Sequence, residues 1–324
     1  MKVQGSKFKV QGFRFGVGLL LLLVLAICIA ALLGSEKLSF FDLNEQQQTI
    51  LFDIRLPRIL LGASVGASLA LAGASLQSLL RNPLAEPYLL GVSNGAALGT
   101  MLAFVFFAQF EVARPIMAFG GAGIATFVVY QMAKSRAGMN VERLVLSGVI
   151  VTTFLSSIIV LLTSLLDAAK LRSFTFWLLG DLSQATKNGF YLSFIAVIIG
   201  TIVLMQCARA LNLMMIGERD AFDFGVEIGR VRLMVFATSS LLVGTAVAAS
   251  GSVGYVGLIV PHLVRLAIGS DNRLVIPFSA LAGAIFVVSA DTIARVAIAP
   301  RELPVGAITA LIGAPMFIWL LRKN

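Results

Sequence analysis

Charged residues, cysteines and histidines are all scarce in this sequence. Only 13% of the 324 residues are charged and 58% are hydrophobic, whereas about a quarter of the residues in a soluble domain are charged. A soluble domain with a single core is therefore excluded. The two cysteines, Cys28 and Cys207, lie in separate apolar segments, so neither a disulfide framework nor a cluster of thiol ligands is available.

Groups that carry catalysis are missing as well. None of the eight lysines follows a glycine, so the phosphate-binding loop G-x-x-x-x-G-K-[ST] is absent and the chain does not hydrolyse nucleotide by that machinery. The single histidine, His262, has no second ligand nearby, and we predict that it makes a structural hydrogen bond rather than binding a metal. No cluster of His, Cys or carboxylates supports an enzyme, and we predict no bound metal or cofactor.

Long apolar runs dominate what is present. Ten of them are long enough to cross a hydrocarbon layer of about 30 Å, and they cover residues 17–33, 59–80, 88–109, 115–133, 144–166, 189–208, 233–250, 253–268, 275–298 and 304–321. We predict an all-α, polytopic membrane protein with about ten transmembrane helices. Residues 1–16 are predicted to form a disordered, basic cytosolic tail, and residues 17–324 a single transmembrane domain.

The distribution of charge gives the orientation. If the N-terminus lies inside, 16 of the 25 basic residues and 7 of the 16 acidic residues fall on the inner side. This agrees with the positive-inside rule and places both termini in the cytoplasm. The net charge of +9 is therefore explained by topology, and we predict no nucleic-acid partner.

The stretch "RNPLAEPYLLGVSNGA", residues 81–96, is unusually polar for its place between two apolar segments. Its two prolines remove backbone donors and prevent one continuous helix. Irregular backbone of this kind is tolerated in a membrane only where it is buried in protein or lines a water-filled cavity. The prolines are equally consistent with a rigid tight turn.

Two further segments are too polar to span. Residues 209–232 alternate acids and arginines with large apolar residues and contain three glycines, a pattern that predicts two short amphipathic helices joined at glycine. Such an element on the cytosolic face suits a soluble partner. Residues 167–188 are predicted to form a short helix at or just below the outer surface, with Trp177 at the interface.

Three arginines lie near the outer ends of apolar segments. Arg55 and Arg58 flank Pro57, and because an arginine at the bilayer centre costs about 2.5–3.5 kcal/mol, we expect both at the outer interface. They serve there either as anchors or as a docking point for an acidic partner. Asp291 and Arg295 are spaced i and i+4, which predicts an ion pair on one helical face, although Arg295 is also placed to face a partner.

Five motifs in series resemble the FecCD family, the ten-helix permeases of ATP-binding-cassette (ABC) importers for iron chelates, haem and cobalamin. They are "RLPR" (55–58), "GASLALAGASLQSLLRNPLAEPYLLGVSNGA" (66–96), "GYVGLIVPHLVR" (254–265), "ADTIAR" (290–295) and "ELPVGAITALIGAPMFIWLL" (302–321). The resemblance runs from about residue 50 to the C-terminus. It implies a fold like that of the cobalamin-importer permease and a location in the inner, cytoplasmic membrane.

The resemblance also implies partners. The chain is expected to form a homodimer with the translocation path on the two-fold axis. Two cytosolic ATPase subunits, which would hold the ATP and Mg, are expected below it, and a periplasmic or lipid-anchored substrate-binding protein above it. Residues 209–232 would then be the coupling helices that enter the ATPases.

Individual residues receive roles from the same resemblance. Docking of glutamates on the binding protein is implied for Arg55, Arg58 and Arg295. The inner gate and path are implied to include Gln77, Asn82, Pro83 and Leu84. Coupling to the ATPase is implied for Gly217, Glu218, Arg219, Ala221, Phe224 and Gly225.

The cargo is open between a ferric siderophore or haem, which we expect first, and cobalamin. The cobalamin importer has a Thr-Ser pair in a second gate loop, but the corresponding residues 140–143 here read "NVER", so that role is not carried over. An ion-coupled secondary carrier is the remote alternative. It would need an intramembrane acid, for which Asp291 is the main candidate.

Overall fold

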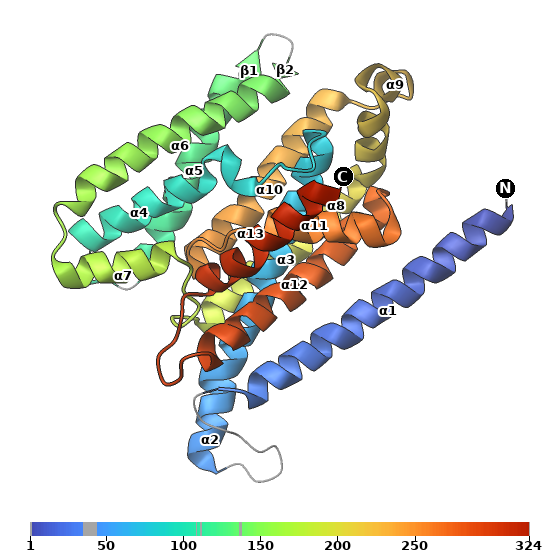
Figure 1. The fold of residues 1–324 in the computed structure, drawn as a ribbon. Coiled ribbons are helices and arrows are strands. Elements are labelled where there is room, and N and C mark those ends of the chain that lie inside the picture. The colour runs from blue at the N-terminus through green and yellow to red at the C-terminus, as the bar shows by residue number, and fades with distance from the viewer. Residues whose placement is uncertain (1, 35–43, 108, 111, 136–137, 324) are drawn as a thin grey trace.

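The computed structural model describes residues 2–34, 44–107, 109–110, 112–135 and 138–323, and within these ranges it is almost entirely helical (Figure 1). Ten helices carry the apolar segments: α1 Lys2–Leu32, α3 Leu56–Leu79, α4 Val92–Phe106, α5 Ala113–Ala133, α6 Val141–Thr163, α8 Lys187–Ile216, α10 Ile228–Ser250, α11 Val256–Ile268, α12 Asn272–Val296 and α13 Val305–Lys323. The shorter elements are α2 Glu45–Thr49, the π-helix η1 Ile50–Arg55, the 3-10 helix η2 Pro87–Leu90, α7 Ala168–Leu178, α9 Glu218–Asp223, and the strands β1 Lys134–Ser135 and β2 Gly138–Met139.

The predicted all-α, multi-span architecture is confirmed. In the described part of the chain, seven helices are long and apolar enough to cross a membrane, and the three shorter apolar helices α4, α11 and α13 complete the ten predicted segments. Two of these three follow backbone that is not α-helical: α4 follows the 3-10 helix η2, and α11 follows the irregular residues 251–255. The short helix predicted within 167–188 is present as α7, and its position at the outer surface stays a prediction.

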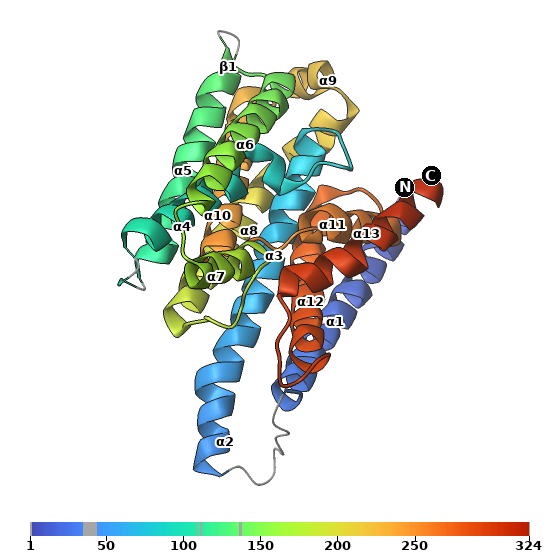
Figure 2. The same cartoon turned by 60° about the vertical axis from the view of Figure 1, so that its left-hand side comes forward.

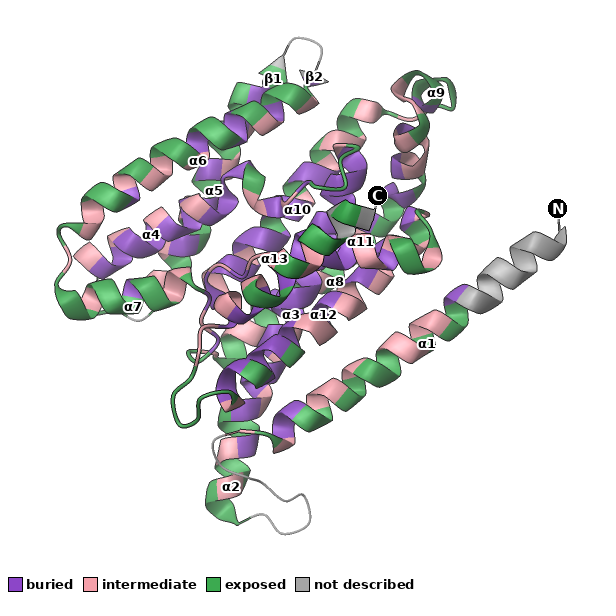
Figure 3. Cartoon of the chain, viewed as in Figure 1, coloured by how far each residue is buried: buried purple, intermediate pink, exposed green. Residues whose placement is uncertain are grey.

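Helix α3 is the centre of the bundle. Of its 24 residues, 21 are buried, and α8, α10, α11 and α12 pack around it (Figure 3). Small residues permit this close packing, because a Cβ on Gly66 would overlap the carbonyl oxygen of Gly283 in α12, and one on Gly73 would overlap that of Gly257 in α11. Contacts between small residues are a principal source of helix association where the solvent is itself apolar.

Two groups of helices flank this centre. Helices α4, α5 and α6 pack together on one side, and α1 lies along α12 on the other (Figure 2). Large apolar side chains are exposed along α1, α5, α6 and α8, as expected for surfaces that face lipid. Both ends of the chain lie toward the same end of the bundle as α9 and the small β1–β2 hairpin (Figure 1).

Two predictions of local structure differ from what is observed, whereas the division into a tail at 1–16 and a domain at 17–324 stays a prediction. A disordered tail at 1–16 is not observed: residue 1 lies outside the described part, and α1 is continuous from Lys2 to Leu32, since no proline interrupts it. Within 209–232 the structure has one separate short helix instead of two. Helix α8 continues to Ile216 before a break at Gly217, because residues 209–216 contain good helix formers and no glycine or proline.

Candidate functional site

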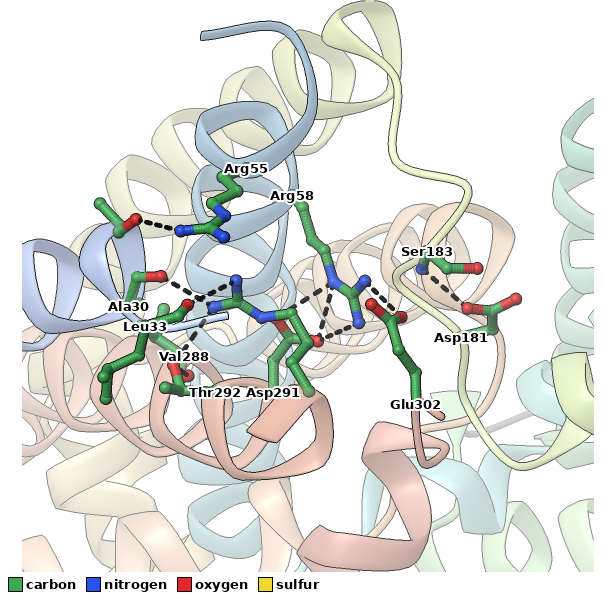
Figure 4. A network of polar contacts seen from close by, with 12 residues as sticks. Ala30, Leu33, Arg55, Arg58, Asp181, Ser183, Val288, Asp291, Thr292 and Glu302 are labelled. Carbon is green, nitrogen blue, oxygen red and sulfur yellow. Dashed lines mark hydrogen bonds and ion pairs between the residues drawn. The ribbon is translucent and has the colours of Figure 1, made fainter. Parts of the chain in front are cut away.

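A buried cluster of charges lies where α3 begins and α12 ends (Figure 4). The Arg58 guanidinium donates from Nε to both carboxylate oxygens of Asp291, at 3.1 and 3.2 Å, and from Nη2 to Oδ1 at 2.9 Å. Its Nη1 donates to Glu302 Oε2 at 2.7 Å. Two acidic residues therefore bind the Arg58 guanidinium. Asp291 is 233 residues and Glu302 is 244 residues away from it in the sequence.

The end of α1 completes this cluster. Arg295 Nε lies 3.1 Å from Asp291 Oδ2, the i, i+4 pair that the sequence predicts, and its Nη2 donates to the Ala30 carbonyl at 3.0 Å. Arg55 Nη1 donates to the Ala31 carbonyl at 2.9 Å. The last carbonyls of a helix lack intrahelical donors and carry partial negative charge, so two arginines cap the C-terminal end of α1.

Burial changes how these arginines are understood. The sequence places Arg55, Arg58 and Arg295 at an accessible outer interface, but they are only 6%, 8% and 4% exposed and donate to acceptors of their own chain. The negative charges of Asp291 and Glu302, together with hydrogen bonds to carbonyls, explain why they are tolerated there. Their role as docking residues stays a prediction, and it requires that these internal contacts be exchanged.

The polar stretch after α3 forms a compact turn at the other end of the bundle. Asn82 Oδ1 accepts from the backbone N–H of Leu84 at 2.9 Å, and the Asn82 carbonyl accepts from that of Ala85 at 3.1 Å. Asn82, Pro83 and Leu84 are all exposed. Arg81 has a φ of +50°, in the left-handed region, which non-glycine residues rarely occupy.

Gln77, which the resemblance places near the translocation path, lies buried between α3 and α11, and its assignment to the path stays a prediction. Gln77 donates from Nε2 to the Leu258 carbonyl of α11 at 2.9 Å. Its Oε1 accepts a short hydrogen bond from Arg265. Because Arg265 also donates to the Ala74 carbonyl at 2.8 Å and to Ser78 Oγ at 2.9 Å, these residues join α3 to α11.

The same polar contacts continue into α12 and α8. Ser78 Oγ donates to Asn272 Oδ1 at 2.6 Å, and Asn272 donates from Nδ2 to Asn212 Oδ1 at 2.9 Å. Asn212 donates in turn to Asp271 Oδ1 at 2.7 Å. Hydrogen bonds from Arg273 and Asn212 lower the pKa of the Asp271 carboxyl to about 2, against the opposing effect of partial burial.

Helix α9 projects from the end of the bundle between α8 and α10. Gly217 precedes it and Gly225 follows its C-cap, and Gly225 has a φ of +79°, where a glycine is favoured. Ala221 is fully buried beneath the helix, whereas Arg219 is exposed. Three large apolar side chains in or next to α9 are exposed, although this region lies outside the predicted apolar segments. They are Ile216 at 75%, Phe222 at 71% and Phe224 at 75%. Exposed apolar groups of this kind outside a lipid-facing surface mark a protein interface.

The donor set does not suggest a metal centre. Among the described residues, no group of three His, Cys, Asp or Glu side chains is arranged to hold a metal ion. The Nε2 atom of His262 is buried without a hydrogen-bond partner in the described structure, so the structural hydrogen bond predicted for it is not observed there.

Comparison with known proteins decides the family. The model of the FecCD transport family matches residues 21–323. The chain belongs to this family. Among its relatives, the cobalamin import system permease protein BtuC of Halobacterium salinarum is 43% identical over 287 residues, covering 88% of this chain and 76% of the relative. The hemin transport system permease protein HmuU of Yersinia pestis is 38% identical over 322 residues, covering 96% of each.

A solved structure agrees with this membership of the FecCD family. It is described as an inward-facing conformation of a metal-chelate type ABC transporter, and it matches 95% of this chain and 98% of its own with a TM-score of 0.87 at 35% identity. This FecCD chain is thus a transport permease of an ABC importer, as the five sequence motifs indicate.

Several residues that the structure brings into these clusters were missed from the sequence. Glu302 was seen only as part of a motif, and Arg81, Arg232, Arg265, Asn212 and Asn272 received no role. A polar residue inside an apolar helix, such as Arg265, is a usable signal because it needs a partner. The identity of that partner is not a local property of the sequence.

Proposed function

We propose that a homodimer of this chain forms the membrane pathway of an ATP-driven importer for a bulky metal chelate, either a ferric siderophore or haem. The observation that supports this most strongly is the match to a metal-chelate type ABC transporter, which extends over 95% of the chain. The relative named as a hemin permease, aligned over 96% of both chains, points to the same cargo class. The relatives named as cobalamin permeases make cobalamin the second candidate.

ATP hydrolysis belongs to two separate cytosolic subunits that bind ATP and Mg. The surface that would receive them is α9 with its flanking residues, where Ile216, Phe222 and Phe224 are exposed. A cytosolic position for α9 places both termini in the cytoplasm, and the permease then lies in the cytoplasmic membrane. Residues Gly217, Glu218, Arg219, Ala221, Phe224 and Gly225 form the coupling element in this proposal.

A periplasmic or lipid-anchored binding protein would deliver the cargo at the opposite end. Arg58 is bound there by Glu302, whose side chain is 38% exposed and therefore displaceable. A carboxylate of the binding protein would take the place of Glu302 on Arg58. Arg55 and Arg295 would exchange their α1 carbonyl acceptors in the same way. Charge complementarity of this kind chiefly steers and orients the partner.

The inner gate is assigned to the exposed turn of Asn82, Pro83 and Leu84. Gln77 would act behind it by joining α3 to α11 rather than by contacting cargo. An ion-coupled carrier is disfavoured because Asp291 is bound by both Arg58 and Arg295, so its carboxylate is not available to a coupling ion.

The test is transport by the assembled importer. The chain would be purified with an ATPase subunit, reconstituted into liposomes with a binding protein, and assayed in parallel with a ferric siderophore, haem and cobalamin. Uptake of one of the two iron compounds that requires MgATP is the expected result. Uptake of cobalamin alone would select the second candidate. Uptake driven by an imposed proton or sodium gradient without ATP would contradict the proposal.

A further inference from the structure

We propose that Glu218 is a positioning residue that transmits movement of α9 to the inner turn at residues 81–86. This inference rests on the proposed function and adds to it the connection between the ATPase-facing helix and the gate. The connection is a carboxylate shared by two arginines from different parts of the chain. Neither arginine has a role in the site described above.

The contacts of Glu218 join three segments. Its Oε1 accepts from Arg232 Nη2, in α10, at 2.5 Å and lies 3.5 Å from Arg81 Nη2, directly after α3. Arg232 Nη1 donates in addition to the Met139 carbonyl in β2 at 2.8 Å. The first residue of α9 is therefore tied to the gate turn, to α10 and to the hairpin that precedes α6. Figure 2 shows α9 beside the loop that follows α3.

The position of Arg81 makes this contact mechanically useful. Arg81 immediately precedes Asn82, and its left-handed backbone conformation is unfavourable for a residue with a Cβ. Asn82 N–H donates to the Gln77 carbonyl at 3.1 Å, so the turn is fixed at its start to the end of α3. Displacement of the Arg81 side chain therefore moves the residue at which the turn begins. The backbone of that residue can respond by leaving its unfavourable left-handed conformation.

Arg232 supports the carboxylate from the opposite side. Its side chain is 15% exposed, and Glu218 is the acidic group within ion-pair distance of it in the described structure. The Nε of Arg232 has no hydrogen-bond partner there. Loss of the Glu218 carboxylate would leave a largely buried guanidinium without its counter-charge, so Glu218 cannot leave this position without cost and α9 stays attached to α10.

The side chains of Glu218 and Arg81 are 44% and 40% exposed. Ion pairs at such exposure contribute little to folding. Arg81→Gln should therefore act on the transmission of movement rather than on the fold, whereas Glu218→Gln also removes the counter-charge of the largely buried Arg232.

A reporter in the turn tests this inference without any cargo. Cys28 and Cys207 would be replaced by serine, and a spin label attached at Leu84→Cys in the complex with the ATPase subunit. The distance between the two labels of the homodimer would then be measured with and without bound ATP. In the parent we expect a shift on nucleotide binding. In Glu218→Gln and in Arg81→Gln we expect that shift to fall at least twofold. The double variant should show the same reduction of the shift as either single variant.

Glu142→Gln is the matched control. It makes the same chemical change at the same end of the bundle, at an exposed glutamate for which the described residues supply no ion pair, and the shift should be retained. A full shift in Glu218→Gln or Arg81→Gln, or an equal loss in the control, would overturn the inference. Loss of the ATPase subunit from Glu218→Gln would do so too, because the carboxylate would then bind the ATPase. If the parent itself fails to bind an ATPase subunit, the proposed function fails instead.

Discussion

Replacing Asp291 with asparagine should destabilise the protein strongly, because Arg58 and Arg295 share this carboxylate. All three side chains are at least nine-tenths buried. Asparagine keeps the shape but removes the negative charge, and it leaves two buried guanidinium groups with reduced compensation. Breaking a buried pair by removing one partner costs about 3–5 kcal/mol. Since Arg58 retains Glu302 at 2.7 Å, we expect a loss near the lower limit, about 3 kcal/mol.

Glu302→Gln provides the comparison for this experiment. It is the same kind of substitution on the same arginine, but its carboxylate is partly exposed, so we expect a loss of about 1 kcal/mol or less. The free energy of unfolding would be measured for both variants by titration with sodium dodecyl sulfate in mixed micelles. Equal destabilisation by the two substitutions would refute the reasoning, because it would mean that burial of Asp291 contributes nothing beyond an exposed pair.

Three further predictions concern packing, docking and pH. Gly66→Leu should abolish the monodisperse peak in size-exclusion chromatography because its side chain overlaps the α12 backbone, whereas Gly120→Leu, at a position with open space, should not. Phe224→Ser should reduce copurification of the ATPase subunit at least tenfold, since it removes exposed apolar contact area, while Phe110→Ser at the opposite end should have no effect. Asp271 has a folded-state pKa of about 2, below its ordinary value of 3.8, so its stabilising effect is fully present above about pH 4 and is lost as the pH falls through 2. The difference in melting temperature between the parent and Asp271→Asn should therefore shrink from pH 5 to pH 2.

The helices were predictable because a membrane imposes local rules. Each spanning segment must satisfy its own backbone hydrogen bonds, so apolar length alone identifies it, and all ten predicted segments have a helix in the structure. The Asp291–Arg295 pair was predictable for a similar reason, since residues four apart lie on one helical face. The extent of α8 and the single short helix at α9 were not, because composition at 209–232 does not reveal where an exposed helix stops.

Apolar length and charge distribution are enough to identify a multi-span membrane protein, and the five motifs are enough to identify its family. Tertiary structure alone decided which charges are exposed. Arg58 lies 233 residues from Asp291, and Gln77 lies 188 residues from Arg265, so neither partner is visible in any local pattern. A buried charge is tolerated only beside its counter-charge or acceptors, and those are brought to it by the packing of α3 against helices from the far end of the chain.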